Sequence, residues 1–155
     1  INRRSGSFFF LGELILDIEL DYDGPDKDYC GSCTLCLDAC PTDALTQPYV
    51  IDATKCISYL TIELKAKEKI PGEFKDKMDN WMFGCDICQD VCPWNHFSKP
   101  HAEPELFANK FLMQMDEQKW ETMEEKEFKI WFRDSALKRT KFEGIKRNLK
   151  FLKEE

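Results

Sequence analysis

The fold of this chain is decided by the stretch CGSCTLCLDACP, residues 30–41, and by a shorter counterpart, CDICQDVCP, residues 85–93. The second stretch keeps the cysteine spacing and the final proline of the first. It lacks the first cysteine, and Met82 stands at that position. The eighth cysteine, Cys56, lies between the two stretches, so every cysteine of the 155-residue chain falls between positions 30 and 92. This concentration indicates that the eight thiols share one role.

The run C-x-x-C-x-x-C-x-x-x-C-P is the ligand pattern of two-cluster ferredoxins, in which the fourth cysteine binds the other cluster. Three thiolates separated by two residues wrap a tight loop around three corners of an iron–sulfur cubane. The fourth corner must come from elsewhere in the chain, and the following proline turns the backbone away. The sequence therefore predicts two [4Fe–4S] clusters.

Crossed ligation assigns every cysteine to one of these clusters. The ligands expected for the first cluster are Cys30, Cys33, Cys36 and Cys92. The second cluster receives three cysteines from the two stretches and lacks one ligand, which only Cys56 remains to supply. The ligands expected for the second cluster are therefore Cys40, Cys56, Cys85 and Cys88.

Two other uses of the cysteines remain open at this point. Two Cys₄ zinc sites would also consume eight thiols, but three cysteines in one C-x-x-C-x-x-C run suit a cubane better than a single ion. Disulfides are disfavoured because the sequence shows no secretion signal. A brown iron chromophore, against colourless zinc, distinguishes the first two possibilities.

Composition and charge narrow the class of protein. Hydrophobic residues make up 43% of the chain and aromatic residues 13%, which excludes wholesale disorder. No apolar run approaches the roughly 18 residues of a membrane span, so no membrane partner is expected. The net charge of −7 argues against general binding of nucleic acid. The charge is uneven, however, with seven acids and one lysine at residues 13–28 and six bases and one acid at residues 138–150.

We expect an α+β, helix-rich fold, in which a two-cluster bacterial ferredoxin-like module carries a helical C-terminal extension. The expected boundaries are 1–24 for the end of a preceding domain with its connector, 25–100 for the module and 101–155 for the extension. Residues 8–20 have the composition of a buried strand that needs a partner. The chain opens at Ile1, and we interpret it as the back part of a longer protein.

Local patterns predict the helices. One is expected at residues 52–68 with Asp52 as its N-cap, and a short one at 73–83 with Phe74 and Met78 facing inward. Capping boxes are expected at Thr122 and Thr140. The core of the extension is expected to hold the aromatic residues Trp120, Trp131 and Phe132, and the apolar stripe of the last helix, Phe142, Ile145, Leu149 and Leu152.

Five stretches carry a resemblance to a known family. They are GSFFFLGEL (6–14), CGSCTLCLDACPTDAL (30–45), CISYLTIE (56–63), GCDICQDVCPWN (84–95) and ALKRTKFEGIKRN (136–148). In this order and spacing they resemble consecutive motifs of the epoxyqueuosine reductases, cobalamin-dependent enzymes of queuosine synthesis. The resemblance covers nearly the whole chain and includes the replacement of the cysteine at Met82 by Cys56. The reductive dehalogenases are similar at a greater distance.

The resemblance implies an iron–sulfur electron-transfer role. The full enzyme would reduce epoxyqueuosine in a tRNA anticodon to queuosine, with the clusters reducing cobalamin. The proton donor would lie upstream, so no catalytic residue is expected in this chain, and residues 1–24 would end an N-terminal cobalamin-binding domain. Ser58 and Asp86 are expected near the cobalamin, which makes the second cluster the proximal one. The expected partners are the modified tRNA and a low-potential electron donor, and a cytoplasmic monomer is expected.

A different class of function stays open beside this one. The chain would then be a stand-alone two-cluster ferredoxin-type electron-transfer or interaction module that serves another corrinoid or redox partner. A cobalamin-binding domain upstream of Ile1 favours the reductase, and its absence favours the free carrier.

The basic residues near the C-terminus also have two interpretations. They are either the solvated face of a helix or contacts to the tRNA backbone, and the resemblance favours tRNA. The residues concerned are Lys138, Arg139, Lys141, Lys146, Arg147 and Lys150.

The two histidines, His96 and His101, lie in a proline-bounded loop without a catalytic partner at a suitable spacing. We expect them to serve local structure. A solvated turn is more consistent than a calcium loop with the acids at residues 21–28, because the EF-hand order fails.

Overall fold

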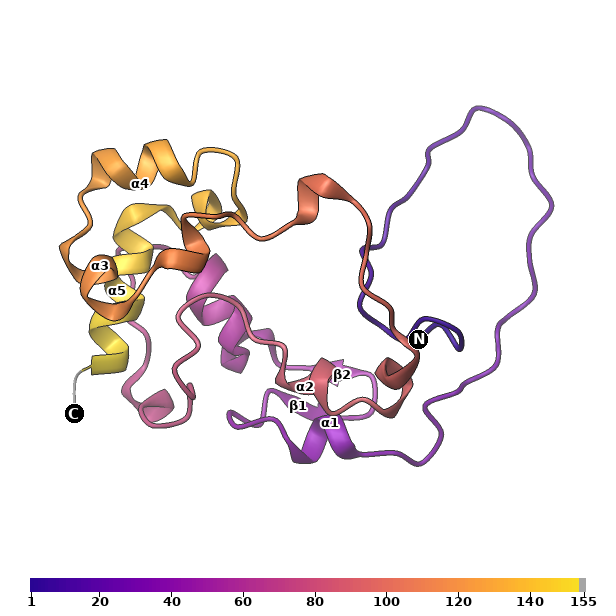
Figure 1. Ribbon diagram of the computed structural model, residues 1–155. Coiled ribbons are helices and arrows are strands. Elements are labelled where there is room, and N and C mark those ends of the chain that lie inside the picture. The colour runs from indigo at the N-terminus through magenta and orange to yellow at the C-terminus, as the bar shows by residue number, and fades with distance from the viewer. Residues whose placement is uncertain (154–155) are drawn as a thin grey trace.

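The computed structural model describes residues 1–153 of the chain. Its regular elements are α1 (Leu35–Asp38), β1 (Leu45–Gln47), β2 (Val50–Ile51), α2 (Ile87–Asp90), α3 (Glu117–Thr122), α4 (Glu125–Trp131) and α5 (Lys141–Lys153). Figure 1 shows α1, α2 and the two strands close together, while α3, α4 and α5 gather around the C-terminal end. This arrangement confirms the predicted α+β, helix-rich fold.

The two cysteine-rich stretches have the same backbone geometry. The residue before α1, Thr34, has φ −119° and ψ 5°, and the residue before α2, Asp86, has φ −117° and ψ 10°. The carbonyl of each accepts the N–H groups three and four residues later, at 2.8–3.0 Å for Thr34 and at 2.8 Å for Asp86. Helix α1 packs against α2. The sequence repeat is therefore a structural repeat, and its two copies lie side by side.

The segment after the first stretch forms a hairpin and then the turn that contains Cys56. Strands β1 and β2 pair antiparallel, and Asp52 N donates to Ala44 O at 2.8 Å to close the hairpin. The Asp52 carboxylate then caps the short 3₁₀ turn Ala53–Lys55 by accepting from Thr54 N at 3.1 Å.

The predicted helix at 52–68 is wrong in its extent. Cys56 is extended, with φ −68° and ψ 127°, and a helical segment resumes after it and ends in a π-helical turn at Tyr59–Glu63, called the π-turn below. The Thr61 hydroxyl donates to Ile57 O at 2.7 Å, and side-chain bonds of this kind to the preceding turn bend helices. Leu64 leaves the helical conformation, with ψ 123°.

The helix predicted at 73–83 does not form, although the two side chains predicted to face inward are buried. Only the 3₁₀ turn Gly72–Phe74 forms. Positive φ values at Asp76, Asp79 and Asn80 break any longer helix, because the left-handed region is incompatible with it. Phe74 and Met78 are nevertheless buried, as the pattern indicated.

The C-terminal extension has a compact core that the sequence predicts well. Trp120 and Phe132 are buried and stack with ring centroids 5.5 Å apart. The expected stripe of α5 contributes Ile145, which is 1% exposed, with Phe142 and Leu149 packed against the same core.

Neither capping box forms at its predicted position, Thr122 or Thr140. The box that forms joins Glu124 and Glu127 at the start of α4, because α3 runs on as far as Thr122. Thr140 precedes α5, but its hydroxyl donates to the carbonyl oxygens of Thr61 and Ile62, both at 2.8 Å.

The N-terminal segment does not form the predicted strand. Residues 8–28 run as a wide open loop, visible in Figure 1 as the long excursion beside the N-terminus. Phe10 is 88% exposed and Ile15 is fully exposed. A strand requires a neighbouring strand for its backbone hydrogen bonds, and within residues 1–153 this segment pairs with none. None of the helices in the described part of the chain is both long enough and apolar enough to span a membrane.

Candidate iron–sulfur site

The four expected ligands of the first cluster line one cavity. This cavity has a volume of about 270 Å³, and Cys30, Cys33, Cys36 and Cys92 all contribute to its wall. Burial raises the pKa of the Cys30 thiol, and the nearby thiols of Cys36, Cys33 and Cys92 and the Asp28 carboxylate raise it further. The structure thus brings together cysteines that lie up to 62 positions apart in the sequence.

The ligands expected for the second cluster are also electrostatic neighbours. Burial raises the pKa of Cys88, and the thiols that raise it further include Cys85, Cys56 and Cys40. Burial is the largest cause of the raised pKa of Cys85 as well, and Cys56 and Cys40 again contribute. Cys56 is therefore near enough to Cys85 and Cys88 to influence the pKa values of both thiols.

Cys40 differs from these thiols because its sulfur accepts several hydrogen bonds. Burial acts to raise its pKa, but the Leu45 N–H, the Thr42 hydroxyl and further backbone N–H groups stabilise the thiolate, so that its pKa is lowered overall. The Cys40 sulfur lies 3.7 Å from the Thr42 hydroxyl oxygen. Hydrogen bonds to cluster sulfurs are one means by which proteins set cluster potential.

The two cysteine sets are adjacent. Cys88 lines the cavity of the first set although its expected place is in the second, and Cys36 is among the thiols that raise its pKa. Crossed ligation requires this closeness, because each set borrows one cysteine from the other stretch.

The donor set fits iron–sulfur clusters. Neighbouring thiols that raise each other's pKa are poor thiolates until a positively charged group binds them, and a coordinating thiol is deprotonated outright. A Cys₄ zinc ion needs four sulfurs about 2.3 Å from one point. In residues 1–153, no three His, Cys, Asp or Glu side chains are arranged to hold a single metal ion. All eight thiols are free of disulfide bonds.

Residues at the end of the second stretch fix the first set from outside. Trp94 Nε1 donates to Tyr29 O at 3.0 Å, immediately before Cys30. Asn95 Oδ1 accepts from Ser7 N at 2.6 Å, and its Nδ2 donates to Gln89 O at 2.6 Å. These contacts join the N-terminal segment to α2, and no sequence pattern predicts them.

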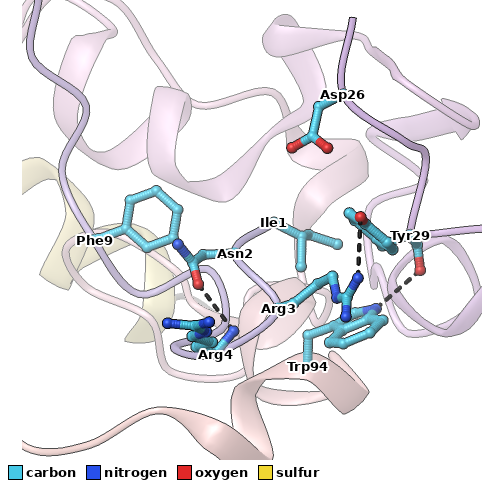
Figure 2. Close-up of a pocket in the computed structure, with 8 residues that line it drawn as sticks. All are labelled: Ile1, Asn2, Arg3, Arg4, Phe9, Asp26, Tyr29 and Trp94. Carbon is cyan, nitrogen blue, oxygen red and sulfur yellow. Dashed lines mark hydrogen bonds between the residues drawn. The ribbon is translucent and has the colours of Figure 1, made fainter.

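A second hollow adjoins Trp94. It has a volume of about 830 Å³ and is lined by residues 1–4 together with Phe9, Asp26, Tyr29 and Trp94. Figure 2 shows Arg3 reaching Tyr29, whose hydroxyl accepts from Arg3 Nη1 at 3.2 Å. The guanidinium carbon of Arg3 also lies 4.7 Å from the centre of the Tyr29 ring. The lining of the hollow therefore carries two arginines and one carboxylate, that of Asp26.

The residues expected near cobalamin lie beside the second set. Ser58 Oγ donates to Cys85 O at 3.4 Å. Asp86 follows Cys85 directly and is exposed, with its backbone carbonyl engaged at the start of α2. The two side chains thus belong to one region of the surface, at the meeting of the Cys56 and Cys85 segments.

The basic residues near the C-terminus do not share one environment. Lys138 and Lys141 are exposed. Arg139 forms a two-pronged ion pair with Glu63, at 2.6 and 2.8 Å, and this pair lowers the pKa of Glu63. Lys146 Nζ donates to the carbonyls that end α3, at 2.9 Å for Trp120 O. Three of these donors, including Arg147, bind the protein itself.

The histidines contact only their surroundings in the loop. His96 Nδ1 lies 2.9 Å from Pro93 O, and the His101 ring lies 5.5 Å from that of Phe107. In the acidic turn, Asp26 Oδ1 accepts from Lys27 N and Asp28 Oδ1 accepts from Cys30 N, both at 2.8 Å.

Comparison with known proteins bears on this site directly. Residues 29–95 match the family described as "4Fe-4S double cluster binding domain". This range contains all eight cysteines. Residues 29–95 therefore form a domain of the 4Fe-4S double-cluster type.

Close relatives point to a particular enzyme. Epoxyqueuosine reductases from Cyclobacterium marinum and Leadbetterella byssophila are 61% and 59% identical to it, over 100% and 99% of this chain and 49% of each relative. The enzyme from Escherichia coli is 49% identical over 72% of this chain and 29% of its own length. The chain spans about half the length of the first two relatives.

Solved structures of epoxyqueuosine reductases are also similar to this chain. A crystal structure of epoxyqueuosine reductase with an epoxyqueuosine-modified tRNA-Tyr stem loop superimposes with a TM-score of 0.76 at 37% identity, over 85% of this chain and 34% of that one. The enzyme from Bacillus subtilis gives a TM-score of 0.71 at 36% identity, over 86% and 35%. In sequence and in fold the chain is similar to about half of an epoxyqueuosine reductase.

Proposed function

We propose that this chain is the iron–sulfur electron-transfer part of an epoxyqueuosine reductase, which reduces cobalamin for the conversion of epoxyqueuosine to queuosine in tRNA. The observation that carries the proposal is the closeness of the eight cysteines: five line one cavity, and the other three influence the pKa of Cys88. The identity of up to 61% with epoxyqueuosine reductases supports the choice of enzyme.

The protein's own part in this function is to hold and insulate two redox groups. When bound, the clusters supply one-electron transfer at low potential. The first set holds one cluster through Cys30, Cys33, Cys36 and Cys92, and the second holds the other through Cys40, Cys56, Cys85 and Cys88. Because the sets are adjacent at Cys36 and Cys88, electrons can pass from one to the other inside a single small body.

The cobalamin belongs, on this proposal, beside the second set. Ser58 and Asp86 lie where the Cys56 and Cys85 segments meet, which supports their assignment to the cofactor's surroundings. The exposed apolar residues of the N-terminal loop support the assignment of residues 1–24 to the end of a cobalamin-binding domain. Residues 25–100 are then the two-cluster module and residues 101–155 the helical extension of a cytoplasmic enzyme.

Contact with the tRNA backbone is assigned first to Lys138 and Lys141, because both side chains are exposed. In the complete protein, Lys138→Glu combined with Lys141→Glu is expected to weaken tRNA binding, with a shallower dependence of affinity on salt. Lys126→Glu, an exposed position on α4, serves as the matched control. Unchanged affinity in the double variant would remove tRNA contact from this end of the chain.

Turnover tests the function as a whole. The complete protein, loaded with both clusters and supplied with cobalamin and a strong reductant, is expected to convert epoxyqueuosine in tRNA to queuosine. A Cys33→Ala variant is expected to lose this turnover. If the intact, cluster-loaded protein forms no queuosine, the proposal is overturned and a free ferredoxin-type carrier becomes the better description.

A further inference from the structure

The C-terminal helix reaches across the molecule to the segment that carries Cys56. Arg147 of α5 donates to backbone carbonyls in and just after the π-turn. Arg147 Nη2 donates to Leu60 O at 2.8 Å, and Nη1 donates to Leu64 O at 3.0 Å and to Lys65 O at 2.9 Å. The guanidinium group thus caps this turn, so Arg147 binds the protein itself.

The next residue, Asn148, is completely buried and joins two segments. Its Nδ2 donates to Thr61 O at 2.8 Å and to Met82 O at 2.9 Å. Its Oδ1 accepts from Arg147 Nε at 3.0 Å and from Nη2 at 2.8 Å. Arg147 therefore fixes the orientation of the amide, because only one placement of oxygen and nitrogen satisfies both sides.

Both segments lead directly to ligands of the second set. Thr61 lies in the turn that follows Cys56, and its hydroxyl also accepts from Gly84 N at 3.0 Å, one residue before Cys85. Met82 stands at the position of the cysteine that the second stretch lacks. Asn148 binds the backbone at this position through its hydrogen bond to Met82 O.

We propose that Asn148, oriented by Arg147, is a positioning residue for the second cluster, tying the segment after Cys56 to the segment that leads into Cys85. The inference rests on the proposed function, since it assumes that these cysteines ligate a cluster. The first set obtains three ligands from one short loop, whose own backbone fixes their spacing. The second set draws ligands from segments far apart in sequence, so their separation has to be fixed by a third element, and α5 is that element.

The test compares cluster content in the complete protein, purified without oxygen. Asn148→Leu keeps the volume and removes the amide. We expect its iron content to fall from about eight to about four atoms per chain. We further expect the EPR spectrum of the reduced variant to match that of Cys56→Ala, which lacks a second-cluster ligand, and not that of Cys33→Ala.

Lys146→Met provides the matched control. Lys146 is the neighbour of Arg147 on α5 and also donates to backbone carbonyls, but to those of Trp120 and Glu121 at the end of α3. This variant is expected to keep both clusters. A folded Asn148→Leu protein with both clusters intact, with neither cluster, or with the spectrum of Cys33→Ala overturns the inference.

A milder variant decides the matter if Asn148→Leu does not fold. Thr140→Val removes the bonds to Thr61 O and Ile62 O but keeps the shape of the side chain. It is expected to retain both clusters and to shift only the EPR component that Cys56→Ala lacks. No shift, or a shift in the other component, contradicts the inference. A wild-type protein without iron would instead overturn the proposed function itself.

Discussion

The two cysteine-rich stretches show how one backbone design is used in two ways. Helices α1 and α2 begin with nearly identical dihedral angles and hydrogen bonds, and each stretch ends in a cysteine followed by proline. The first stretch carries four cysteines and the second carries three. The backbone repeat therefore does not depend on the first cysteine of the pattern.

The difference lies in what supports each copy. The first set is fixed by Trp94 and Asn95, which bind the backbone at Tyr29 and Ser7. The second set has Cys56 as a neighbour of Cys85 and Cys88, and Asn148 of the C-terminal helix binds the backbone at Thr61 and Met82. A ligand that moves to another segment therefore needs contacts from residues distant in the sequence to hold that segment in place.

The largest expected effect is the loss of a whole cluster when a cysteine that crosses between the stretches is removed. Cys92→Ala should remove the first cluster and Cys40→Ala the second, although each cysteine belongs to the opposite stretch. Iron content should fall from about eight to about four atoms per chain in both variants. Their reduced EPR spectra should match those of Cys33→Ala and Cys56→Ala, respectively. The reverse correspondence would show that each stretch ligates its own cluster.

Restoring the missing cysteine tests whether the two copies are interchangeable. In the double variant Cys56→Ala with Met82→Cys, we expect no recovery of the second cluster, because the Met82 side chain packs against the core of the extension. Iron analysis against Cys56→Ala alone measures the outcome. Recovery to about eight iron atoms would mean that the second copy can work like the first.

A smaller effect is expected from loosening the support of the first set. Gly6 has φ +79°, and a Cβ added there would lie 2.2 Å from Asn95 Oδ1. Gly6→Ala should displace Ser7 from Asn95 and speed the bleaching of the first cluster in air. Gly72→Ala, where an added Cβ meets nothing within 4 Å, is the control. Equal bleaching of both clusters would show that this contact does not protect the first set selectively.

The smallest effect concerns the exposed pair of Arg139 and Glu63, which has no counterpart in the first copy. The hydrogen bond from Arg139 is the largest cause of the lowered pKa of Glu63. A lowered carboxyl pKa stabilises the fold above its unfolded value, and this stabilisation is lost as pH falls through the folded value. Arg139→Gln should therefore be slightly less stable than wild type at pH 7, with the difference vanishing in acid. Thermal unfolding at pH 7 and in acid, with Glu63→Gln as the control, measures this difference in stability.

The sequence indicated which cysteines lie near one another better than it indicated the contacts that hold their segments in place. Ligand spacing follows the local geometry of the cubane, so Cys56 could be assigned by elimination, and the structure places it near Cys85 and Cys88. The apolar stripe of α5 was equally readable, because burial follows helical periodicity.

The roles of Arg147 and Asn148 could not be predicted, because they depend on contacts with residues more than 60 positions away. From the sequence alone, a basic residue that contacts a phosphate cannot be distinguished from one that donates to a backbone carbonyl. The break at Cys56 and the π-turn were missed for a related reason, since tertiary hydrogen bonds override the helical pattern there. The strand expected at residues 8–20 needs a partner that the described residues do not provide.

The central claim is that the eight cysteines hold two cubanes. Its most direct test is the content of iron, acid-labile sulfide and zinc in the complete protein purified without oxygen. The account predicts about eight iron and about eight sulfide per chain, with no zinc. Stoichiometric zinc, or about four iron in a fully loaded protein, would contradict it.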